Sequence, residues 1–350
     1  MMQAMKLLIL GGGVFLGSAA LDAAVRRGHT VTVFNRGRSR TVWPGGVEAI
    51  AGDRVADLGR LAGRRWDAVI DTCGYVPSDV RASVQALHES GCYLFVSSIS
   101  VYADPTGPGD ESAVLNRLEG AESAQLSLGA YGALKAACEE AAQAVLPGRV
   151  QCVRAGLILG PYDNDERFAW WLRRVARGGE VLAPGSPESL VQFIDVRDLA
   201  AWMVRSAEQR LAGVFNVTGP GEPTTMRALL ETIREVTGGD ASFTWVPSEL
   251  LVEHEVGPYS EMPFWLPSPW DTFRIDVTRA KAAGLRYRPM IDTVRAAWEW
   301  LSTGWDAAAP ARANRRLTVP AGMAPDREAK ILAEAHRRGV AQGERGGARG

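Results

Sequence analysis

Three residues whose side chains could hold and exchange a proton stand within one stretch of the sequence. Ser98 follows the apolar run YLFVS, and Tyr131 and Lys135 are four residues apart in AYGALKAACEEA. On a helix, that spacing places the tyrosine and the lysine on one face. A phenol with a pKa near ~10 is a weak acid or base at neutral pH, but a nearby ammonium group lowers that pKa. With a serine hydroxyl to hold a substrate oxygen, these residues could perform acid–base chemistry at a hydroxyl or carbonyl carbon.

Each of these residues also has an ordinary structural explanation. Lys135 could form a helix-surface pair with Glu139, although Lys before Glu is the less favourable order and contributes only ~0.2–0.5 kcal/mol. Tyr131 could pack in a core with Leu134 and Cys138 on the same stripe. The functional interpretation is the better one only if a cofactor site lies beside them.

A glycine-rich turn in LLILGGGVFLGSAALDAA predicts such a site. Gly11 can adopt a tight turn, Gly13 lets the backbone approach a pyrophosphate, and Gly17 lets the following helix pack closely. Phe15 and Leu16 stand where that helix begins, and a helix N-terminus offers free N–H groups and a partial positive charge to phosphate. The position of the turn, after the first strand and before the first helix, is typical of a dinucleotide-binding unit.

The end of the second strand indicates which dinucleotide fits. An NAD site usually has a carboxylate there, but this sequence reads VFNRGRSR, with Asn35 followed by Arg36, Arg38 and Arg40. Because arginine pairs well with phosphate, we predict that NADP(H) binds more tightly than NAD(H). The alternative is a solvated basic loop with no role in cofactor binding.

Three further residues are candidates for the adenosine end of the cofactor. Asp53, in AGDRVADL, could accept a hydrogen bond from the adenine amino group. Cys73 and Gly74, in DTCGY, are small and would leave room for the adenosine. Ordinary loop roles would explain all three equally well.

The surrounding sequence predicts the scaffold that positions these residues. Continuous apolar runs suit strands buried on both faces of a parallel sheet, and amphipathic segments ending in glycine separate several of them. We therefore predict an α/β fold, a doubly wound parallel Rossmann sheet with a smaller C-terminal α/β substrate lobe. The runs lie at residues 6–10, 30–34, 47–51, 67–71, 93–97 and 150–154.

The domain boundaries follow from where this alternation loosens. We assign residues 1–163 to the dinucleotide-binding domain, with 189–219 returning to its sheet. The substrate lobe then comprises 164–188 and 220–303. Residues 304–350 are rich in Ala, Gly and Arg, and we expect a basic, flexible tail with one short helix, DREAKILAEAHRR.

Composition narrows the partners and the compartment. The formal net charge of −1 creates no field that would recruit nucleic acid or an anionic membrane. Four scattered cysteines and four dispersed histidines predict reduced thiols and no metal site. No apolar run is long enough to span a bilayer, so we expect a cytoplasmic protein that acts on a small molecule.

The motifs together resemble the extended short-chain dehydrogenases/reductases, the NAD-dependent epimerase/dehydratase family. The resemblance runs from about Lys6 to Leu301 and rests on GGGVFLG, SSISVY, YGALK, RAGLILGP and FIDVRDLA. It implies an NAD(P)-dependent enzyme in which Ser98, Tyr131 and Lys135 form the catalytic triad, with Ser97 in reserve. Lys135 would also contact the nicotinamide ribose, and paired helices in this family often make a homodimer.

The chain departs from the family pattern at two positions that bear on function. Relatives commonly have glycine where this turn has Val14, whose side chain narrows the space beside the pyrophosphate. Sugar-nucleotide enzymes of the family usually carry Asn in RxxNxxGP, where this chain has Leu157, which cannot replace that hydrogen bond. The aromatic stretch PFWLPSPW, with Trp265 and Trp270, further suggests a loop lid over an apolar substrate.

We therefore predict an oxidoreductase that transfers hydride at a hydroxyl or carbonyl carbon of a small, partly apolar substrate. A sugar-nucleotide epimerase or dehydratase is the first alternative. The second is a non-catalytic family member that binds a dinucleotide, or RNA through the basic tail.

Overall fold

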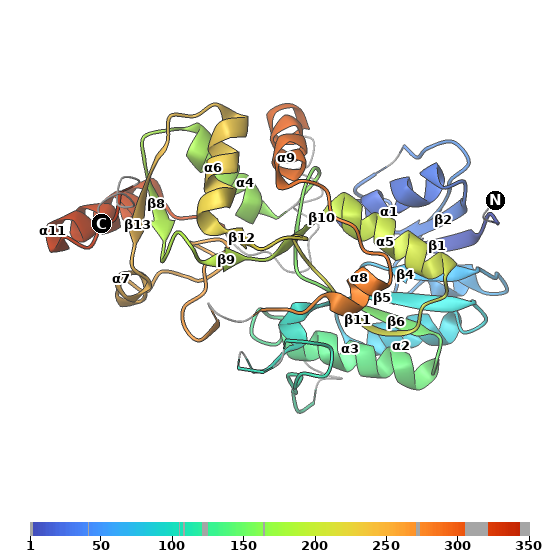
Figure 1. Cartoon of the computed structure of the whole chain (residues 1–350). Coiled ribbons are helices and arrows are strands. Elements are labelled where there is room, and N and C mark those ends of the chain that lie inside the picture. The colour runs from blue at the N-terminus through green and yellow to red at the C-terminus, as the bar shows by residue number, and fades with distance from the viewer. Residues whose placement is uncertain are drawn as a thin grey trace.

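The protein is described by a computed structural model over residues 3–40, 42–104, 106–107, 109–120, 125–163, 165–270, 274–304 and 321–343. Within these residues the largest element is a seven-stranded parallel sheet in the order β11-β6-β5-β4-β1-β2-β3 (Figure 1). Its strands are β1 (Lys6–Leu10), β2 (Thr30–Asn35), β3 (Glu48–Ala51), β4 (Ala68–Asp71), β5 (Cys92–Ser98), β6 (Val150–Ala155) and β11 (Gly213–Val217).

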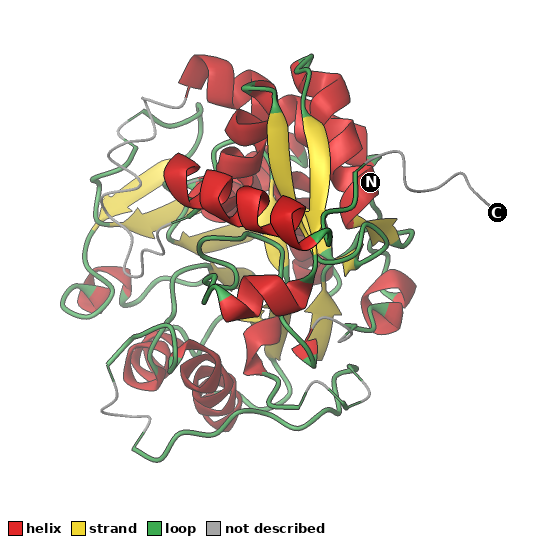
Figure 2. Ribbon diagram, turned by 90° about the vertical axis from the view of Figure 1, so that its left-hand side faces the viewer, coloured by secondary structure: helices red, strands yellow, loops and turns green. Residues whose placement is uncertain are grey.

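Helices cover both faces of this sheet (Figure 2). One face packs against α1 (Phe15–Arg26) and α5 (Val196–Glu208), and the other against α2 (Pro77–Ala86) and α3 (Tyr131–Val145). Because side chains alternate along a strand, Leu7 and Ile9 of β1 enter the first core, and Leu8 and Leu10 enter the second. This two-sided burial explains the continuous apolar runs, and it confirms the predicted doubly wound fold.

The strand order reverses between β1 and β4, because the chain builds outward to β2 and β3 before crossing back. In open parallel sheets, ligands bind in the crevice at the carboxyl ends of the strands next to such a reversal. The glycine turn, which follows β1, and the segment after β4 both open onto this crevice.

A smaller lobe is built from short strands and helices around its own core. Its two-stranded units are β7 (Leu157–Leu159) with β10 (Phe193–Asp195), β8 (Glu180–Pro184) with β13 (Ser242–Val246), and β9 (Leu190–Val191) with β12 (Thr224–Thr225). The helices of this half are α4 (Glu166–Ala176), α6 (Met226–Thr237), α7 (Ser248–Glu253) and α9 (Met290–Gly304). A short helix, α8 (Thr278–Ala282), instead packs against the large sheet beside β11.

The segment 189–219 returns to the large sheet only in part. Helix α5 packs on α1 and strand β11 joins the sheet beside β6, as predicted. Strands β9 and β10 instead pair with β12 and β7 outside the sheet. The exact domain boundaries stay predictions.

The short helix predicted in the tail is present as α11 (Pro325–Arg338). It is not a mobile part of a tail, because its Ile331, Leu332 and Ala335 are buried in the core of the smaller lobe. Its Glu328 is also buried and forms an ion pair with Arg174 of α4, at 2.7 Å between Nε and Oε2. The apolar stripe of α11 and this ion pair make it an integral part of the lobe. The rest of the predicted tail, 305–320 and 344–350, lies outside the described residues.

The described part of the chain was also searched for membrane-spanning helices and for groups of metal-binding side chains. None of its helices combines the length and the apolar character needed to cross a membrane. Nor do three or more of its His, Cys, Asp and Glu side chains gather where they could hold a metal ion.

Candidate active site

A cavity of about 1000 Å³ lies at the carboxyl ends of β1, β2, β4, β5 and β6 and extends beneath loops of the smaller lobe. It is lined by every residue that we predicted for the site except Gly74. These residues are Gly11, Gly13, Phe15, Leu16, Gly17, Asn35, Arg36, Asp53, Cys73, Ser98, Tyr131 and Lys135. The reserve residue Ser97 lines it too. The fold therefore brings together side chains from five different strand ends.

The glycine turn has the geometry that a dinucleotide requires. Gly11 has φ +110°, and a Cβ there would lie 2.3 Å from the Thr72 hydroxyl oxygen. At Gly17 a Cβ would lie 2.5 Å from the backbone nitrogen of Gly12, so the helix can approach the turn this closely only with glycine. A Cβ at Gly13 would have no neighbour nearer than 3.4 Å, which leaves open space beside the turn. These residues fit a dinucleotide pyrophosphate.

Gly12, which our sequence analysis passed over, is also needed for the turn. Its φ is +75°, in the left-handed region, and a Cβ there would lie 2.8 Å from a methyl group of Val33. The three-glycine run could have revealed this position. Phe15 adopts φ +37°, a strained conformation for a residue with a side chain, at the point where α1 begins. Val14 precedes it in extended conformation and also lines the cavity.

The end of β2 is fixed by Asn35 and is basic beyond it. The Asn35 side-chain amide donates to the carbonyl oxygen of Gly11 at 2.9 Å, and its oxygen accepts from the backbone N–H of Gly37. Asn35 therefore links the glycine turn after β1 to the turn after β2. Its side-chain groups are engaged in these two hydrogen bonds, so fewer of them can contact a cofactor. Arg36 and Arg38 line the cavity, whereas Arg40 donates to Ser18.

The two small residues after β4 have different positions. Cys73 lines the cavity, but Gly74 does not. A Cβ at Gly74 would lie 2.7 Å from ring and methyl carbons of Phe95 and Val80. The packing of α2 on β5 thus explains the glycine at 74, and a contact of Gly74 with adenosine stays a prediction.

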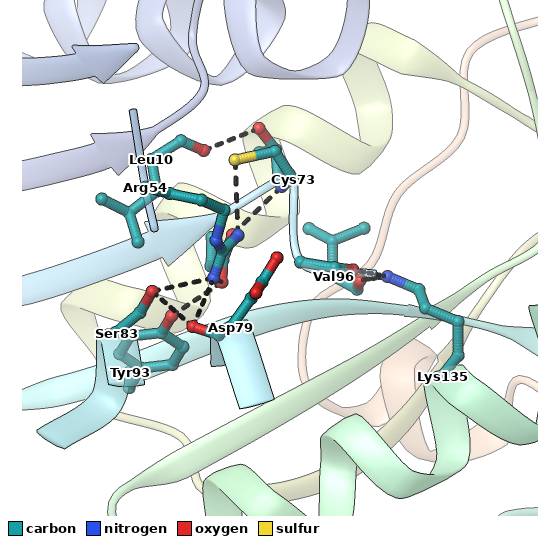
Figure 3. Close-up of polar contacts among 11 residues, drawn as sticks. Leu10, Arg54, Cys73, Asp79, Ser83, Tyr93, Val96 and Lys135 are labelled. Atoms are coloured by element: carbon teal, nitrogen blue, oxygen red, sulfur yellow. Dashed lines mark hydrogen bonds and ion pairs between the residues drawn. The ribbon is translucent and has the colours of Figure 1, made fainter. Parts of the chain in front are cut away.

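A buried ion pair lies below the adenosine end, and the sequence analysis did not identify it (Figure 3). Arg54 and Asp71 form two parallel hydrogen bonds of 2.9 Å, and neither side chain is more than 6% exposed. Asp71 also accepts from Tyr93, and Arg54 donates to Ser83 and, at 3.5 Å, to the Cys73 sulfur. Burial alone would raise the pKa of Asp71, but the Arg54 guanidinium holds it below its usual value.

Asp53, which precedes Arg54, lines the cavity and shapes its own loop. One of its carboxylate oxygens accepts from the backbone N–H of Val55 at 2.8 Å. Its backbone N–H donates to Asp57 at the same distance. These bonds hold the Asp53 carboxylate at the edge of the cavity.

Ser98, Tyr131 and Lys135 surround the middle of the cavity. Ser98 ends β5 and caps the 3₁₀ turn η2 (Ile99–Val101), with its hydroxyl within 3.1 Å of both the hydroxyl and the N–H of Ser100. Tyr131 is the first residue of α3, is half-buried and lines the cavity, and it belongs to none of the hydrophobic cores on the sheet.

Lys135 is 4% exposed and held in one position. Its Nζ donates to the carbonyl oxygens of Gly74 at 2.7 Å and Val96 at 2.6 Å, the latter visible in Figure 3. It also lies 4.5 Å from the centre of the Phe95 ring. Because an ammonium group has three protons, one remains for a ligand.

The contacts of these two helix residues do not match the ordinary explanations. Glu139 pairs not with Lys135 but with Arg154 of β6, in a buried ion pair at 2.8 Å. Leu134 and Cys138 are fully buried, whereas Tyr131 is not part of their cores.

The far end of the cavity combines apolar and aromatic side chains with charged and polar ones, which are Asp163, Asp165, Arg167, Gln192 and Arg274. Leu157 lies here, together with side chains of α4, α6 and the 259–270 loop. Trp265 lines the cavity, is 6% exposed and donates from Nε1 to the Ser248 hydroxyl, and the predicted lid over the substrate stays a prediction. Further apolar and aromatic lining residues here include Phe168, Leu190, Val191, Met226, Tyr259, Phe264, Leu266 and Trp270.

Comparison with known proteins agrees with this fold. The model of the NAD dependent epimerase/dehydratase family matches residues 77–218. The structure of UDP-glucuronic acid 4-epimerase from Bacillus cereus, in complex with NAD, superposes with a TM-score of 0.63 at 16% identity. That match covers 85% of this chain and 99% of the epimerase.

Two curated relatives have different functions. A chloroplast stem-loop binding protein of 41 kDa from Arabidopsis thaliana is 26% identical over 61% of this chain, and the match spans 58% of that protein's length. A 2-alkyl-3-oxoalkanoate reductase from Stenotrophomonas maltophilia is 28% identical over 67% of this chain and 76% of its own.

The fold is thus that of a dinucleotide-binding enzyme with a doubly wound parallel sheet. Residues 77–218 are similar to the NAD dependent epimerase/dehydratase family, the family that the motifs resemble.

Proposed function

We propose that the protein is an NADP(H)-dependent reductase of a carbonyl group on a small, partly apolar substrate. The observation that carries this proposal is the cavity itself. A glycine turn lies at one end, Ser98, Tyr131 and Lys135 lie in the middle, and an aromatic chamber lies at the other. The curated relative that is a 2-alkyl-3-oxoalkanoate reductase supports reduction of a carbonyl.

The roles of the three residues follow from their chemistry and positions. A bound reduced nicotinamide supplies a hydride to the carbonyl carbon. Ser98 donates a hydrogen bond to the carbonyl oxygen and holds it beside Tyr131. Tyr131 transfers its phenolic proton to that oxygen, so the carbonyl, the hydride and the proton together make the alcohol. Lys135, held by two backbone carbonyls, places a fixed positive charge that favours the phenolate left on Tyr131.

The apolar far end supports a reductase rather than a sugar-nucleotide enzyme. Leu157 lies in the lining, where its side chain cannot donate to or accept from a diphosphate. The neighbouring aromatic rings favour binding of an alkyl or ring-containing body through burial of apolar surface.

The preference for NADP(H) rests on the end of β2. Arg36 and Arg38 line the cavity, and the loop that follows β2 carries no carboxylate before Glu48. A 2′-phosphate placed there would accept hydrogen bonds from guanidinium groups, whereas a free ribose hydroxyl would find no acceptor carboxylate.

The test is turnover with named probes. Purified protein is incubated with NADPH and a panel of 2-alkyl-3-oxo acids, and cofactor oxidation and the alcohol product are measured. Tyr131→Phe should lower kcat by ~10²–10⁴-fold, because it removes the proton donor. The matched control is Tyr162→Phe, since that ring lies outside the cavity lining and is 61% exposed. Tyr131→Phe with wild-type turnover would disprove the mechanism.

The same preparation distinguishes the epimerase alternative. UDP-glucose is supplied with catalytic NAD, and its epimer is sought by chromatography. Epimer formation without net change in cofactor absorbance would replace the reductase proposal.

A second candidate function, RNA binding, is favoured by one observation. A curated relative is a stem-loop binding protein, and residues 304–350 are basic. Retention of a labelled RNA hairpin, weakening steeply as salt rises, would support this function. Failure to retain the hairpin at low salt would remove it.

A further inference from the structure

The first turn of α3 rests directly on η2, and a glycine makes this contact possible. Gly132 follows Tyr131, and a Cβ at position 132 would lie 2.0 Å from the carbonyl oxygen of Ser100. That oxygen is a backbone atom and accepts from the Asn116 side-chain amide at 3.1 Å, and the amide nitrogen would itself lie 3.2 Å from the added Cβ. A side chain at position 132 would therefore push Tyr131 away from the turn that Ser98 caps.

A second contact joins α3 to the same turn two helical turns further along. Arg154 of β6 donates to both carboxylate oxygens of Glu139 on α3, at 2.8–3.3 Å, and both side chains are 3% exposed. The same guanidinium donates to the hydroxyl of Tyr102 at 3.0 Å. Tyr102 directly follows η2 and donates in turn to Asn216 of β11 at 2.6 Å. The ion pair thus links α3, β6, the end of η2 and β11.

Stability alone does not account for this arrangement. A buried ion pair loses hydration that its mutual attraction often fails to recover, and well-packed apolar residues of similar volume are commonly as stable. Glycine is also a poor helix former, so its place in the first turn of α3 follows from the close contact with η2 and not from helix propensity. Both features lie where α3 meets η2.

We infer that Gly132 and the Glu139–Arg154–Tyr102 chain are positioning residues that set the separation between the Tyr131 phenol and the Ser98 hydroxyl. The inference rests on the proposed function, because it concerns how those two groups meet one substrate oxygen. Gly132 sets how closely α3 packs on η2. The Glu139–Arg154 ion pair prevents α3 from rotating or shifting along η2. Catalysis at two groups on different elements depends on such placement, and an error of ~1 Å can cost ~100-fold in rate.

The test compares Gly132→Ala with Gly59→Ala, a substitution in η1 (Leu58–Leu61) that meets no atom within 4 Å. Gly132→Ala should lower kcat by ~100-fold and shift the pH profile of kcat. The dissociation constant for NADPH, measured by titrating its fluorescence, should remain that of the wild type. Gly59→Ala should change none of these. A merely structural role would lower the thermal midpoint and leave kcat and the pH profile of the folded protein unchanged.

Glu139→Gln provides an independent measurement should Gly132→Ala fail to fold. It keeps the shape of the side chain but leaves Arg154 without its charge partner, and kcat should fall by about tenfold with a shifted pH profile. If either folded variant has wild-type kinetics while Tyr131→Phe is inactive, the inference about positioning is wrong. The proposed reductase function is then unaffected. Wild-type turnover by Tyr131→Phe instead overturns the proposed function itself.

Discussion

The two ends of the cavity are built from different parts of the polypeptide. At the nucleotide end the surface is largely backbone, where a Cβ added at Gly11 or Gly17 would clash within 2.5 Å. At the far end the surface consists of side chains, such as Trp265 and Leu157, on elements of the smaller lobe. A backbone surface can change little without disturbing the sheet, whereas a side-chain surface can change residue by residue. The cofactor class is therefore set by the fold, and the substrate by residues the fold leaves free.

The largest expected effect lies beneath the nucleotide end. Arg54→Met leaves the Asp71 carboxylate buried without its charge partner and should lower the free energy of unfolding by ~3–5 kcal/mol. The control, Arg64→Met, breaks a pair with Glu48 in which both side chains are at least 36% exposed, and should cost ~1 kcal/mol or less. Urea unfolding of both variants makes the comparison, and equal losses would mean that burial is unimportant here.

The Arg54–Asp71 pair also predicts that the free energy of unfolding depends on pH, and Arg54→Met tests this. In the wild type the folded-state pKa of Asp71 is lowered, so the stability from the pair is present above its unfolded pKa of ~4. That contribution is lost as pH falls through the folded-state pKa. In Arg54→Met the unpaired carboxyl gains a proton more easily, so the stability deficit should be largest near neutrality and shrink in acid. A deficit independent of pH would assign the loss to packing.

Gly17→Ala should weaken cofactor binding at the backbone-built end. A methyl group 2.5 Å from the Gly12 nitrogen forces helix and turn apart, at a cost of about 1–3 kcal/mol. The affinities for NADPH and NADH should fall together, since the pyrophosphate is common to both. Gly45→Ala, which meets no atom within 4 Å, is the control for titration calorimetry. Undiminished affinity would show that the turn is more adaptable than its geometry indicates.

Arg38→Ala should separate the two cofactors. Loss of one guanidinium contact to a 2′-phosphate is worth roughly 1.5–3 kcal/mol, and the loss should appear with NADPH and not with NADH. Arg40→Ala is the matched control, because Arg40 donates to Ser18 and Val42 and lies outside the cavity lining. Fluorescence titration with both cofactors decides, and an equal loss for both would remove the proposed preference.

The smallest effect is expected at the far end. Trp270 is half-buried in the cavity lining, and Trp270→Ala should raise KM by a few-fold, with kcat and NADPH affinity unchanged. Trp43→Ala, remote from the lining, should leave KM unaltered. Initial rates over a range of substrate chain lengths would sharpen the result, since the rise should grow with apolar length. A uniform fall in kcat would mean that the two ends are not independent.

The sequence predicted the parts of the molecule that local pattern determines. Each apolar run of the first 155 residues became a strand of the large sheet, because burial on both faces leaves a continuous signal. The glycine turn and the middle of the site followed from motifs whose geometry is short-range. By contrast, local pattern does not predict β9 and β12. Each has only two residues, and they form strands because they pair with each other.

The misplaced features depend on partners distant in the chain. Gly74 reads as room for a ligand until Phe95 and Val80 are known to pack against it. The Arg54–Asp71 pair joins a loop to a strand end, and either residue alone looks solvated. Trp265 lies in a proline-rich stretch typical of an exposed loop, yet it is buried against the smaller lobe. The hydrophobic periodicity of a single sequence does not predict these contacts between residues distant in the chain.

The packing of α11 has a consequence for how the chain folds as it is made. The smaller lobe buries Arg174 and Leu182 against Glu328, so its core stays open until residues 325–338 have left the ribosome. The nucleotide-binding sheet, in contrast, is complete once β11 has been synthesised. The cofactor end of the cavity can therefore form on a nascent chain well before the smaller lobe is complete.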